Sequence, residues 1–321
     1  MAVIHDVMPP FELLQPTSVD DAAAMLAERG AEAWVLAGGM DTFEWLKERT
    51  KRPAALVDLN GIAELRGIRP WEDGLEIGAM TTLSAVAADL VASPQIRNQG
   101  TLGGNISQDT RCWYYRAGWS CYRAGGNICY ADTPTAINRE HAIFDADRCV
   151  AVSPSDTAPA LVALDAQMVI RRGNQERVVA AAEFFVGPGV DIERMTVLEP
   201  GDLLTAIRLP GTWAEAQFYF EKVRDREVWD FPLVNVASAI RPAGDRIEEM
   251  RLVVGAVACQ PRRLTSVETA VAGEPINEAT AERAGQLAVE GALPLQYNGY
   301  KIPLMRNLVK RAIRGATPWT S

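Results

Sequence analysis

Four of the five cysteines in this chain, Cys112, Cys121, Cys129 and Cys149, lie close together in the sequence. Four thiolates gathered on one loop are enough to complete the coordination of a zinc ion or of a [4Fe-4S] cluster. Either group requires that the loop bring the four sulfurs to a common centre. The cysteines therefore constrain this segment more than any other feature of the sequence.

The spacing of the cysteines bears on which group they hold. Eight, seven and nineteen residues separate consecutive cysteines, so the close CxxC-type pairs of a usual zinc site are missing. Widely separated cysteines with glycines between them, as in RAGWSCYRAGGNIC, can wrap the larger cubane, whose four irons each need one thiolate. The spacing favours a [4Fe-4S] cluster. A zinc site and uncoordinated thiols are the alternative interpretations of the four cysteines, because dispersed four-cysteine patterns are weak motifs.

Composition indicates a globular protein that binds small molecules or proteins. The 321 residues are enough for two domains, and 48% hydrophobic content supports a packed core. A net charge of -9 gives no reason to expect binding to nucleic acid or to an anionic membrane. We find no signal-peptide pattern and no apolar run of about eighteen residues, so we expect a cytoplasmic protein without a membrane span. In that compartment clustered cysteines indicate metal or redox chemistry.

The N-terminal sequence predicts a helix followed by a compact βαβ unit. Residues 19–29 have helical periodicity behind Ser18, a suitable N-cap. Residues 33–39 read as a strand that runs into paired glycines, residues 41–49 as a helix and residues 54–60 as a second strand. This unit places a glycine turn between a strand and a helix.

Beyond the cysteines the pattern changes once more. Residues 156–179 read as a helical run followed by a β-hairpin, and the chain becomes β-rich from about residue 212. We therefore place a domain boundary near residue 210. The chain ends in a basic amphipathic helix whose charged residues we interpret as a solvated face that could also dock a partner subunit: Lys301, Arg306, Lys310, Arg311 and Arg314.

Two glycine loops suggest a bound diphosphate. Gly38 and Gly39 follow a strand and precede a helix, where backbone N–H groups can face a phosphate without interference from a Cβ atom. Alone, this AGG sequence is also typical of an ordinary tight turn. The second loop, TLGGN at 101–105, adds a hydroxyl and an amide that can satisfy pyrophosphate oxygens and ribityl hydroxyls. The pair strengthens the prediction.

Several motifs in order give the chain a family resemblance. They are Ala37-Gly38-Gly39, Thr101 to Asn105, SPSDTAPAL at 153–161, Lys222 with DFPLVNVA at 230–237, and Gly255-Ala256-Val257 with Pro261-Arg262-Arg263. Together they resemble the FAD-binding medium subunit of the molybdenum hydroxylase (xanthine dehydrogenase) family over nearly the whole chain.

The resemblance implies an α+β fold in two domains. Residues 1–210 would form the two-part, PCMH-like FAD-binding domain of the medium-subunit type, with subdomains 1–60 and 61–210. An iron–sulfur insert would occupy about 109–150. Residues 212–321 would form a C-terminal α/β sandwich-like domain.

The resemblance also implies which residues hold FAD. Asp156 matches an acidic position that bonds ribityl or ribose hydroxyls. Lys222 matches a lysine near the polar edge of the flavin, which stabilises a reduced, anionic flavin. Trp229 lies near a place where some relatives carry an acid beside the isoalloxazine. The diphosphate and ribityl portions would be lined by Leu36, Ala37, Gly38, Gly39, Met40 and Asp41 in the first loop and by Thr101, Gly104 and Asn105 in the second.

The cysteine insert resembles that of the 4-hydroxybenzoyl-CoA reductase β subunit, which holds an extra [4Fe-4S] cluster. The likeness rests on its position and on the sequences around Cys112 and Cys149, and it makes all four cysteines the cluster ligands. The nineteen-residue last spacer is longer than in that reductase. The same insert also occurs in some aldehyde oxidoreductases of the family, so the parent enzyme stays open.

The implied function is electron transfer within an oxidoreductase, with no catalytic residue on this chain. The two [2Fe-2S] clusters of such enzymes each take four cysteines, and only Cys259 is spare here, so those clusters belong to another polypeptide. We therefore expect a heterotrimer with a large molybdenum-cofactor subunit and a small [2Fe-2S] subunit, exchanging electrons with ferredoxin or another carrier. The alternatives are the same subunit in a hydroxylase or aldehyde dehydrogenase, and a flavoprotein with a structural zinc module.

Other residues near the insert have simpler interpretations. His141 is expected to be a solvated loop residue, because four cysteines already complete a cubane. Cys259 lies in an apolar run and is expected in the core. Five aromatic residues are expected to pack around the cluster and keep water from it: Trp113, Tyr114, Tyr115, Trp119 and Tyr122.

Overall fold

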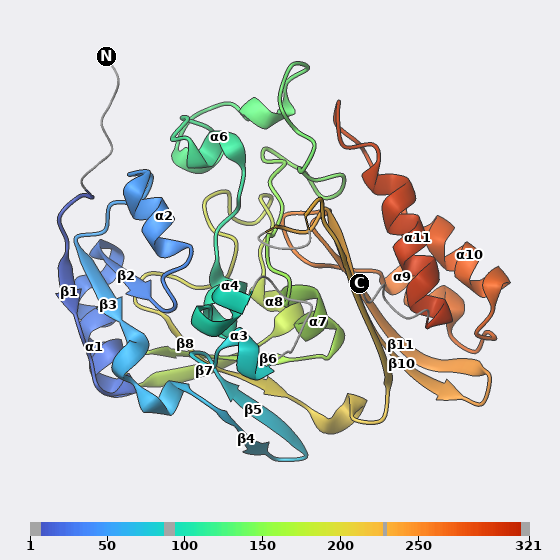
Figure 1. Cartoon of the computed structure of the whole chain (residues 1–321), viewed down its shortest axis with the longest axis horizontal. Coiled ribbons are helices and arrows are strands. Elements are labelled where there is room, and N and C mark those ends of the chain that lie inside the picture. Colours follow the sequence, from blue (N-terminus) through green and yellow to red (C-terminus); the bar gives the residue numbers. More distant parts are fainter. Residues whose placement is uncertain (1–7, 87–93, 227–229, 316–321) are drawn as a thin grey trace.

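The computed structural model describes residues 8–86, 94–226 and 230–315, and these form three sheets with helices around them (Figure 1). The N-terminal unit, the central five-stranded sheet and the C-terminal domain lie side by side, and the cysteine insert rises above the central part. Within the described residues no helix is both long enough and apolar enough to cross a bilayer.

The N-terminal unit confirms the predicted helix and βαβ arrangement. Its strands are parallel in the order β1-β3-β2. Ser18 caps the first helix, since its Oγ accepts a hydrogen bond of 3.1 Å from Asp21 N. The elements are β1 (Glu12–Leu14), α1 (Val19–Arg29), β2 (Ala33–Leu36), α2 (Thr42–Lys47) and β3 (Ala55–Asp58).

The central sheet is antiparallel and has the order β4-β5-β8-β6-β7. The predicted hairpin is β6–β7, and the cysteine insert leaves this unit between α5 and α7. The strands are β4 (Ile68–Trp71), β5 (Gly74–Gly78), β6 (Gln167–Arg172), β7 (Gln175–Ala180) and β8 (Leu203–Leu209). The helices are α3 (Leu83–Val86), α4 (Pro94–Gln99), α5 (Leu102–Ser107), α6 (Trp113–Arg116, in the insert), α7 (Ala158–Ala163) and α8 (Ala181–Phe184).

In its described residues the C-terminal domain is an antiparallel sheet in the order β12-β11-β10-β9, accompanied by the helices α9, α10 and α11. Strand β10 is buried without alternation from Val234 to Ile240, because α11 and α7 both pack against it. The predicted boundary near residue 210 falls between β8 and β9, which belong to different sheets. The elements are β9 (Gln217–Val223), β10 (Val234–Ala243), β11 (Arg246–Gly255), β12 (Arg262–Arg263), α9 (Thr265–Val271), α10 (Glu278–Ala288) and α11 (Lys301–Arg314).

The end of the insert is fastened to the C-terminal domain. The N–H groups of Ile143 and Phe144 both donate to Val257 O, at 2.9 and 3.1 Å, and both side chains are buried in that domain's core. Asn298 Nδ2 donates to His141 O and Ala142 O, each at 3.0 Å. The insert is therefore packed structure and not a free loop.

Lys301 completes this attachment and corrects one expectation. Its Nζ donates to Glu140 O at 2.9 Å and to Ala256 O at 2.6 Å, and the side chain is 0% exposed. Burial lowers the pKa of Lys301 to about 7. The expectation that Lys301 belongs to a solvated face is wrong, because it lies at the start of α11, where the insert covers it.

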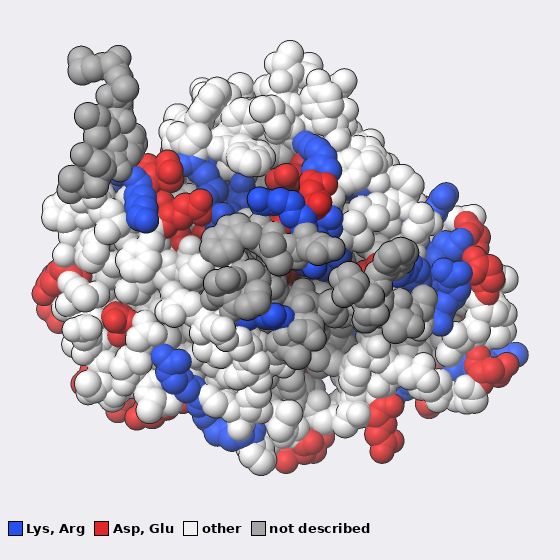
Figure 2. Space-filling model, in the orientation of Figure 1, with Lys and Arg blue, Asp and Glu red and all other residues white. Residues whose placement is uncertain are grey.

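Figure 2 shows the insert as a largely uncharged cap, with acidic and basic side chains gathered below it. Charged side chains also tie the insert to the start of α2. Arg116 donates to Asp41 Oδ1 at 3.1 Å and to Glu44 Oε2 at 2.5 Å, and its guanidinium lies 3.9 Å from the centre of the Trp45 ring. The insert thus contacts both the N-terminal unit and the C-terminal domain.

Candidate functional site

A cavity of about 510 Å³ lies where the N-terminal unit meets the central part of the molecule. Three segments supply most of its walls: residues 33–42, residues 100–109 and residues 193–204. The first two contain the two predicted glycine loops, which are separate in sequence and meet here. The volume falls within the roughly 300–1,000 Å³ that is usual for cofactor sites.

The first glycine loop approaches the backbone just before the second loop so closely that a side chain at Gly38 is excluded. A Cβ atom on Gly38 would lie 2.2 Å from the backbone oxygen of Gln99. Gly39 has a φ of +76°, a conformation that L-residues rarely adopt. Residues 37–41 all line the cavity, whereas Leu36 does not: it is 7% exposed and packs against Leu46 and Leu56.

Asp41 lines the cavity with its charge already compensated. Its Oδ1 lies 2.5 Å from Arg111 Nη1 and 3.1 Å from Arg116 Nη1, and its Oδ2 accepts a hydrogen bond of 2.8 Å from Trp45 Nε1. The same two arginines also pair with Glu44, so two cations offset two carboxylates at this wall. A nearby anionic ligand would not face an uncompensated negative charge.

The second glycine loop opens α5 and is fixed by its own side chains. Thr101 Oγ1 accepts a hydrogen bond of 3.1 Å from Gly104 N, which caps the helix. Asn105 Oδ1 accepts from Ser155 Oγ at 2.7 Å and from Thr157 Oγ1 at 2.6 Å. Thr101, Gly104 and Asn105 all line the cavity, and Asn105 also links it to the predicted 153–161 motif.

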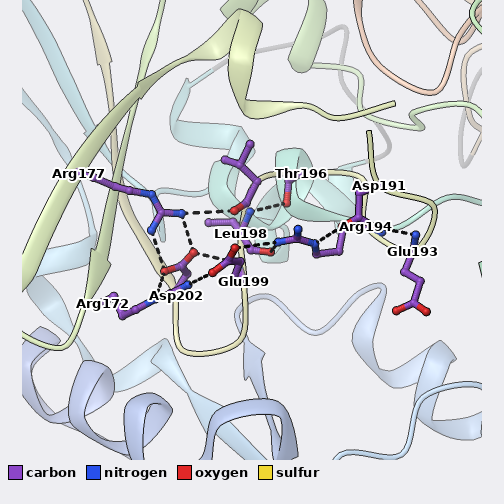
Figure 3. Close-up of polar contacts among 10 residues, drawn as sticks. Arg172, Arg177, Asp191, Glu193, Arg194, Thr196, Leu198, Glu199 and Asp202 are labelled. Carbon is purple, nitrogen blue, oxygen red and sulfur yellow. Dashed lines mark hydrogen bonds and ion pairs between the residues drawn. The ribbon is translucent and has the colours of Figure 1, made fainter. Parts of the chain in front are cut away.

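The third wall is the segment 193–204, which the sequence did not identify (Figure 3). Asp202 fixes it: its carboxylate accepts hydrogen bonds from Arg172 and Arg177 at 2.7 to 2.9 Å and from Glu199 N at 2.9 Å. Burial raises the pKa of Asp202, but these hydrogen bonds outweigh it and hold the pKa below its usual range. The Pro200-Gly201 pair signals a turn, but nothing in the sequence connects that turn to the glycine loops.

Asp156 and Lys222 form a buried pair that is not part of the cavity lining. Lys222 Nζ lies 2.7 Å from Asp156 Oδ2 and donates to Asp230 O at 2.7 Å. Burial raises the pKa of Asp156, and the attraction to Lys222 offsets part of that rise. Asp156 Oδ1 and both polar atoms of the neighbouring Asn235 side chain are buried without a partner. Such atoms are rare in proteins and fit a site completed by a polar ligand. Trp229 lies outside the described residues.

A second, smaller pocket is lined by all four cysteines of the insert, Cys112, Cys121, Cys129 and Cys149. All are free thiols, and Cys121 and Cys149 are 8% exposed. Burial raises the pKa of Cys112 to about 12, so a bound metal would have to displace its proton. In the part of the chain that the structure describes, no three or more His, Cys, Asp or Glu side chains are grouped so that they could hold a single metal ion, so the four cysteines share a pocket without forming a compact one-metal site.

His141 lies at this pocket and not in solvent, which corrects the expectation from the sequence. It is 3% exposed, and its Nε2 is 3.2 Å from Cys112 Sγ. Burial and the charge of Lys301 lower the pKa of His141 to about 4, so the ring is neutral. The expectation failed because the covering residues come from α11 and the segment before it, far along the chain.

The aromatic residues of the insert divide into two groups. Tyr114, Tyr115 and Tyr130 line the cysteine pocket. Trp113 is 58% exposed and Trp119 is 47% exposed, although Trp119 packs edge-on against Tyr130 with ring centroids 4.7 Å apart. Of the five aromatics expected to shield the pocket, Tyr114 and Tyr115 line it, whereas Trp113, Trp119 and Tyr122 do not, and the expectation is wrong for the exposed Trp113. Cys259 is 2% exposed, which confirms its placement in the core.

The two pockets adjoin each other. Asp109 lines the large cavity, and the next residue, Thr110, lines the cysteine pocket. Met195 lines the large cavity and packs against Cys149 and Cys259. The wall between the pockets is therefore one layer of residues.

Comparison with known proteins agrees with this geometry. Residues 9–212 match the family model described as the FAD binding domain in molybdopterin dehydrogenase. Residues 218–316 match the CO dehydrogenase flavoprotein C-terminal domain. The first match contains both glycine loops and the whole cysteine insert, so it covers every predicted site residue except Lys222.

Individual relatives match over most of their length. The chain is 33% identical to the aldehyde oxidoreductase FAD-binding subunit PaoB of Escherichia coli, over 77% of this chain and 81% of that protein. It is 28% identical to the carbon monoxide dehydrogenase medium chain of Hydrogenophaga pseudoflava, over 97% and 98%. A solved structure of that dehydrogenase superposes with a TM-score of 0.74 at 28% identity, covering the same shares. This chain therefore belongs to the family of FAD-binding subunits of molybdopterin dehydrogenases, and it is a component of an oxidoreductase.

Proposed function

We propose that this chain is the FAD- and [4Fe-4S]-containing electron-transfer subunit of a heterotrimeric molybdenum oxidoreductase. Its partners would be a large subunit with the molybdenum cofactor and a small subunit with the [2Fe-2S] clusters. An external carrier such as ferredoxin would exchange electrons with the complex. The observation that carries the proposal is that four cysteines, far apart in sequence, line one pocket directly beside a cavity built for a cofactor.

The family and the cavity support the FAD part. Residues 37–41 would hold the diphosphate, and Thr101, Gly104 and Asn105 the ribityl portion, because these two loops form facing walls of the cavity. When bound, FAD supplies exchange between two-electron and one-electron steps. The protein's own residues position the cofactor and compensate charge: Asp41 is neutralised by arginines, and Lys222 is buried with Asp156.

Asp156, Lys222 and Leu36 stay predictions as cofactor ligands. Asp156 and Lys222 are supported by the unpartnered polar atoms beside them. Leu36 is packed behind the loop, so it would act by supporting the backbone of Ala37 and not by touching the cofactor.

The cysteine pocket supports the cluster. Cysteines are the usual ligands of [4Fe-4S] centres, and the tyrosines around this pocket would limit the access of water, which influences the potential of such a centre. The five cysteines are all unpaired, in keeping with a cytoplasmic location. A structural zinc site is the alternative from another class.

Two kinds of enzyme are candidates for the complex that contains this chain. One is a reductase like 4-hydroxybenzoyl-CoA reductase, on the likeness of the insert. The other is an aldehyde dehydrogenase or hydroxylase, and the 33% identity to an aldehyde oxidoreductase subunit supports it. Assays of the purified complex with an aromatic acyl-CoA ester and with aldehydes would separate the two.

The cluster itself is tested on the full chain, purified without oxygen. We expect about four irons and four labile sulfides per chain, and an electron paramagnetic resonance signal after reduction with dithionite. One zinc per chain with no labile sulfide would show that the insert holds a structural zinc ion and not a cluster. The FAD assignment would stand in either case, because it is measured separately from the flavin absorbance.

A further inference from the structure

Arg123 is a charged side chain buried in the wall between the two pockets. It lies in a short 3-10 turn (Tyr122–Ala124) between the second and third cysteines of the insert, and it is 3% exposed. It lines the cysteine pocket, whereas its contacts Asp109, Glu193 and Met195 line the large cavity. Neither the binding of FAD by the glycine loops nor ligation by the four cysteines requires a cation at this position.

The contacts of Arg123 include no short, paired hydrogen bond to a carboxylate. Nη1 donates to Glu193 O at 2.6 Å, and Nη2 contacts only sulfur atoms, Met195 Sδ at 3.0 Å and Cys259 Sγ at 3.6 Å. Nε is buried and has no partner. A buried guanidinium usually makes short, paired hydrogen bonds to a carboxylate.

The nearest carboxylate does not supply that pairing. Asp109 Oδ1 is 3.4 Å from Arg123 Nη1, longer than a usual charge-assisted hydrogen bond. Its other oxygen, Oδ2, accepts a hydrogen bond of 3.2 Å from Tyr115 and lies 3.4 Å from Lys51 Nζ. One partly exposed carboxylate is thus shared between two cations.

The cysteine pocket is the place where a further negative charge could lie. Burial lowers the pKa of the Arg123 guanidinium, but its electrostatic partners raise that pKa above its usual range. Asp109 is the strongest of these partners, followed by Cys259 and by Cys149, which is one of the four cysteines. Neutral thiols would not offset a buried cation, whereas an iron–sulfur centre ligated by four thiolates is anionic and gains one further negative charge on reduction by one electron.

We propose that Arg123 is the counter-charge of an anionic iron–sulfur centre in the four-cysteine pocket, and that it fixes this centre to the 193–195 wall of the flavin cavity. The inference rests on the proposed function. Because reduction adds negative charge beside the guanidinium, Arg123 stabilises the reduced centre and raises its midpoint potential. It is a positioning residue and takes no part in bond making.

The test compares three variants of the full chain. Arg123→Gln removes the charge, and Arg123→Lys keeps it. Arg148→Gln is the matched control, because Arg148 is adjacent to Cys149 in sequence but has a side chain that is 54% exposed. Iron, sulfide and FAD are counted for each, and the midpoint potential is measured by dithionite titration followed by electron paramagnetic resonance.

We expect Arg123→Gln to lower the midpoint potential, Arg123→Lys to restore most of it, and Arg148→Gln to leave it at the wild-type value. If Arg123→Gln assembles no cluster while it still binds FAD, and Arg123→Lys does assemble one, the charge requirement is equally supported. A wild-type potential in Arg123→Gln overturns the inference, as does a lysine variant that behaves like the glutamine variant. A wild-type chain without iron and sulfide overturns the cluster itself, whatever the variants do.

Discussion

The two adjoining pockets are built from different parts of the chain. In the flavin cavity the backbone of the first glycine loop comes close to the backbone of Gln99 and Gly100 because Gly38 lacks a side chain. The cysteine pocket is formed by side chains that converge from an irregular insert. A backbone site is defined by shape and survives most exchanges of side chains. A side-chain site depends on a few atoms, each of which is indispensable.

The largest expected effect is at the cysteine pocket. Cys121→Ser should remove the cluster entirely while FAD stays bound, because a hydroxyl is a poor substitute for a thiolate on iron and the flavin loops are elsewhere. Iron, sulfide and flavin contents are measured together. Cys259→Ala is the control and should keep its iron, since Cys259 does not line the pocket. A folded Cys121→Ser protein that lost its flavin as well would show that the two sites are not separate.

The second prediction alters the flavin cavity and should leave the cysteine pocket intact. In Gly38→Ala the new Cβ would overlap the Gln99 backbone oxygen, at 2.2 Å, and the two loops would have to move apart. We expect the FAD affinity to fall at least about tenfold, which corresponds to about 1.4 kcal/mol, with unchanged iron content. Gly189→Ala is the control, because its Cβ would have no neighbour within 4 Å. Equal flavin binding by both variants would contradict a site made by backbone proximity.

The third prediction concerns the wall fixed by Asp202. Asp202→Asn should lower the free energy of unfolding at pH 7 by about 2 kcal/mol, because charge-assisted hydrogen bonds are lost, although the exposed arginines reduce the loss. The pKa of Asp202 is lowered in the folded state, so its contribution is complete above the pKa of the unfolded chain and disappears as the pH falls through the folded pKa.

Urea unfolding at several pH values measures this effect. The difference between wild type and Asp202→Asn should be largest near neutral pH and shrink below about pH 4. Glu199→Gln, at an exposed carboxylate on the same wall, should change stability much less. A difference that stayed constant down to pH 3 would argue against the ionised pair as its source.

The smallest expected effect is at the second glycine loop. Thr101→Ala removes the hydroxyl that accepts from Gly104 N and should cost about 1 kcal/mol of stability, the usual value for a lost helix cap. Thr101→Ser keeps the oxygen and should recover most of it. Thermal unfolding of the two variants without added FAD gives the comparison, and equal melting temperatures would show that the cap does not stabilise this loop.

The same contrast explains what could be predicted from the sequence. The glycine loops are contiguous motifs with a strict conformational requirement, so the sequence could suggest them as a diphosphate site, and the family resemblance supplied the individual residues, which the structure brings to one cavity. Leu36 was the exception, because strand residues alternate between faces and this one points into the core. The helix cap at Ser18 and the βαβ unit followed from equally local signals.

The features that were missed depend on contacts between distant segments. The 193–204 wall is held by Arg172 and Arg177 from a hairpin, and no local pattern reveals that pairing. His141 looked solvated because the residues that bury it lie beyond residue 290. Arg123 resembles any surface arginine in the sequence, and only burial beside four cysteines makes it distinctive.

The attachment of the insert to the C-terminal domain also affects the order in which the chain can fold during its synthesis. The hydrogen bond from Asn298 to His141 spans 157 residues. At about 5–20 residues per second, a ribosome that has just made His141 needs roughly 10–30 seconds more to reach Asn298. During that interval Ile143 and Phe144 have no core to enter. The hydrogen bonds from Asn298 that hold the end of the insert against the C-terminal domain therefore form only after most of the chain has been made.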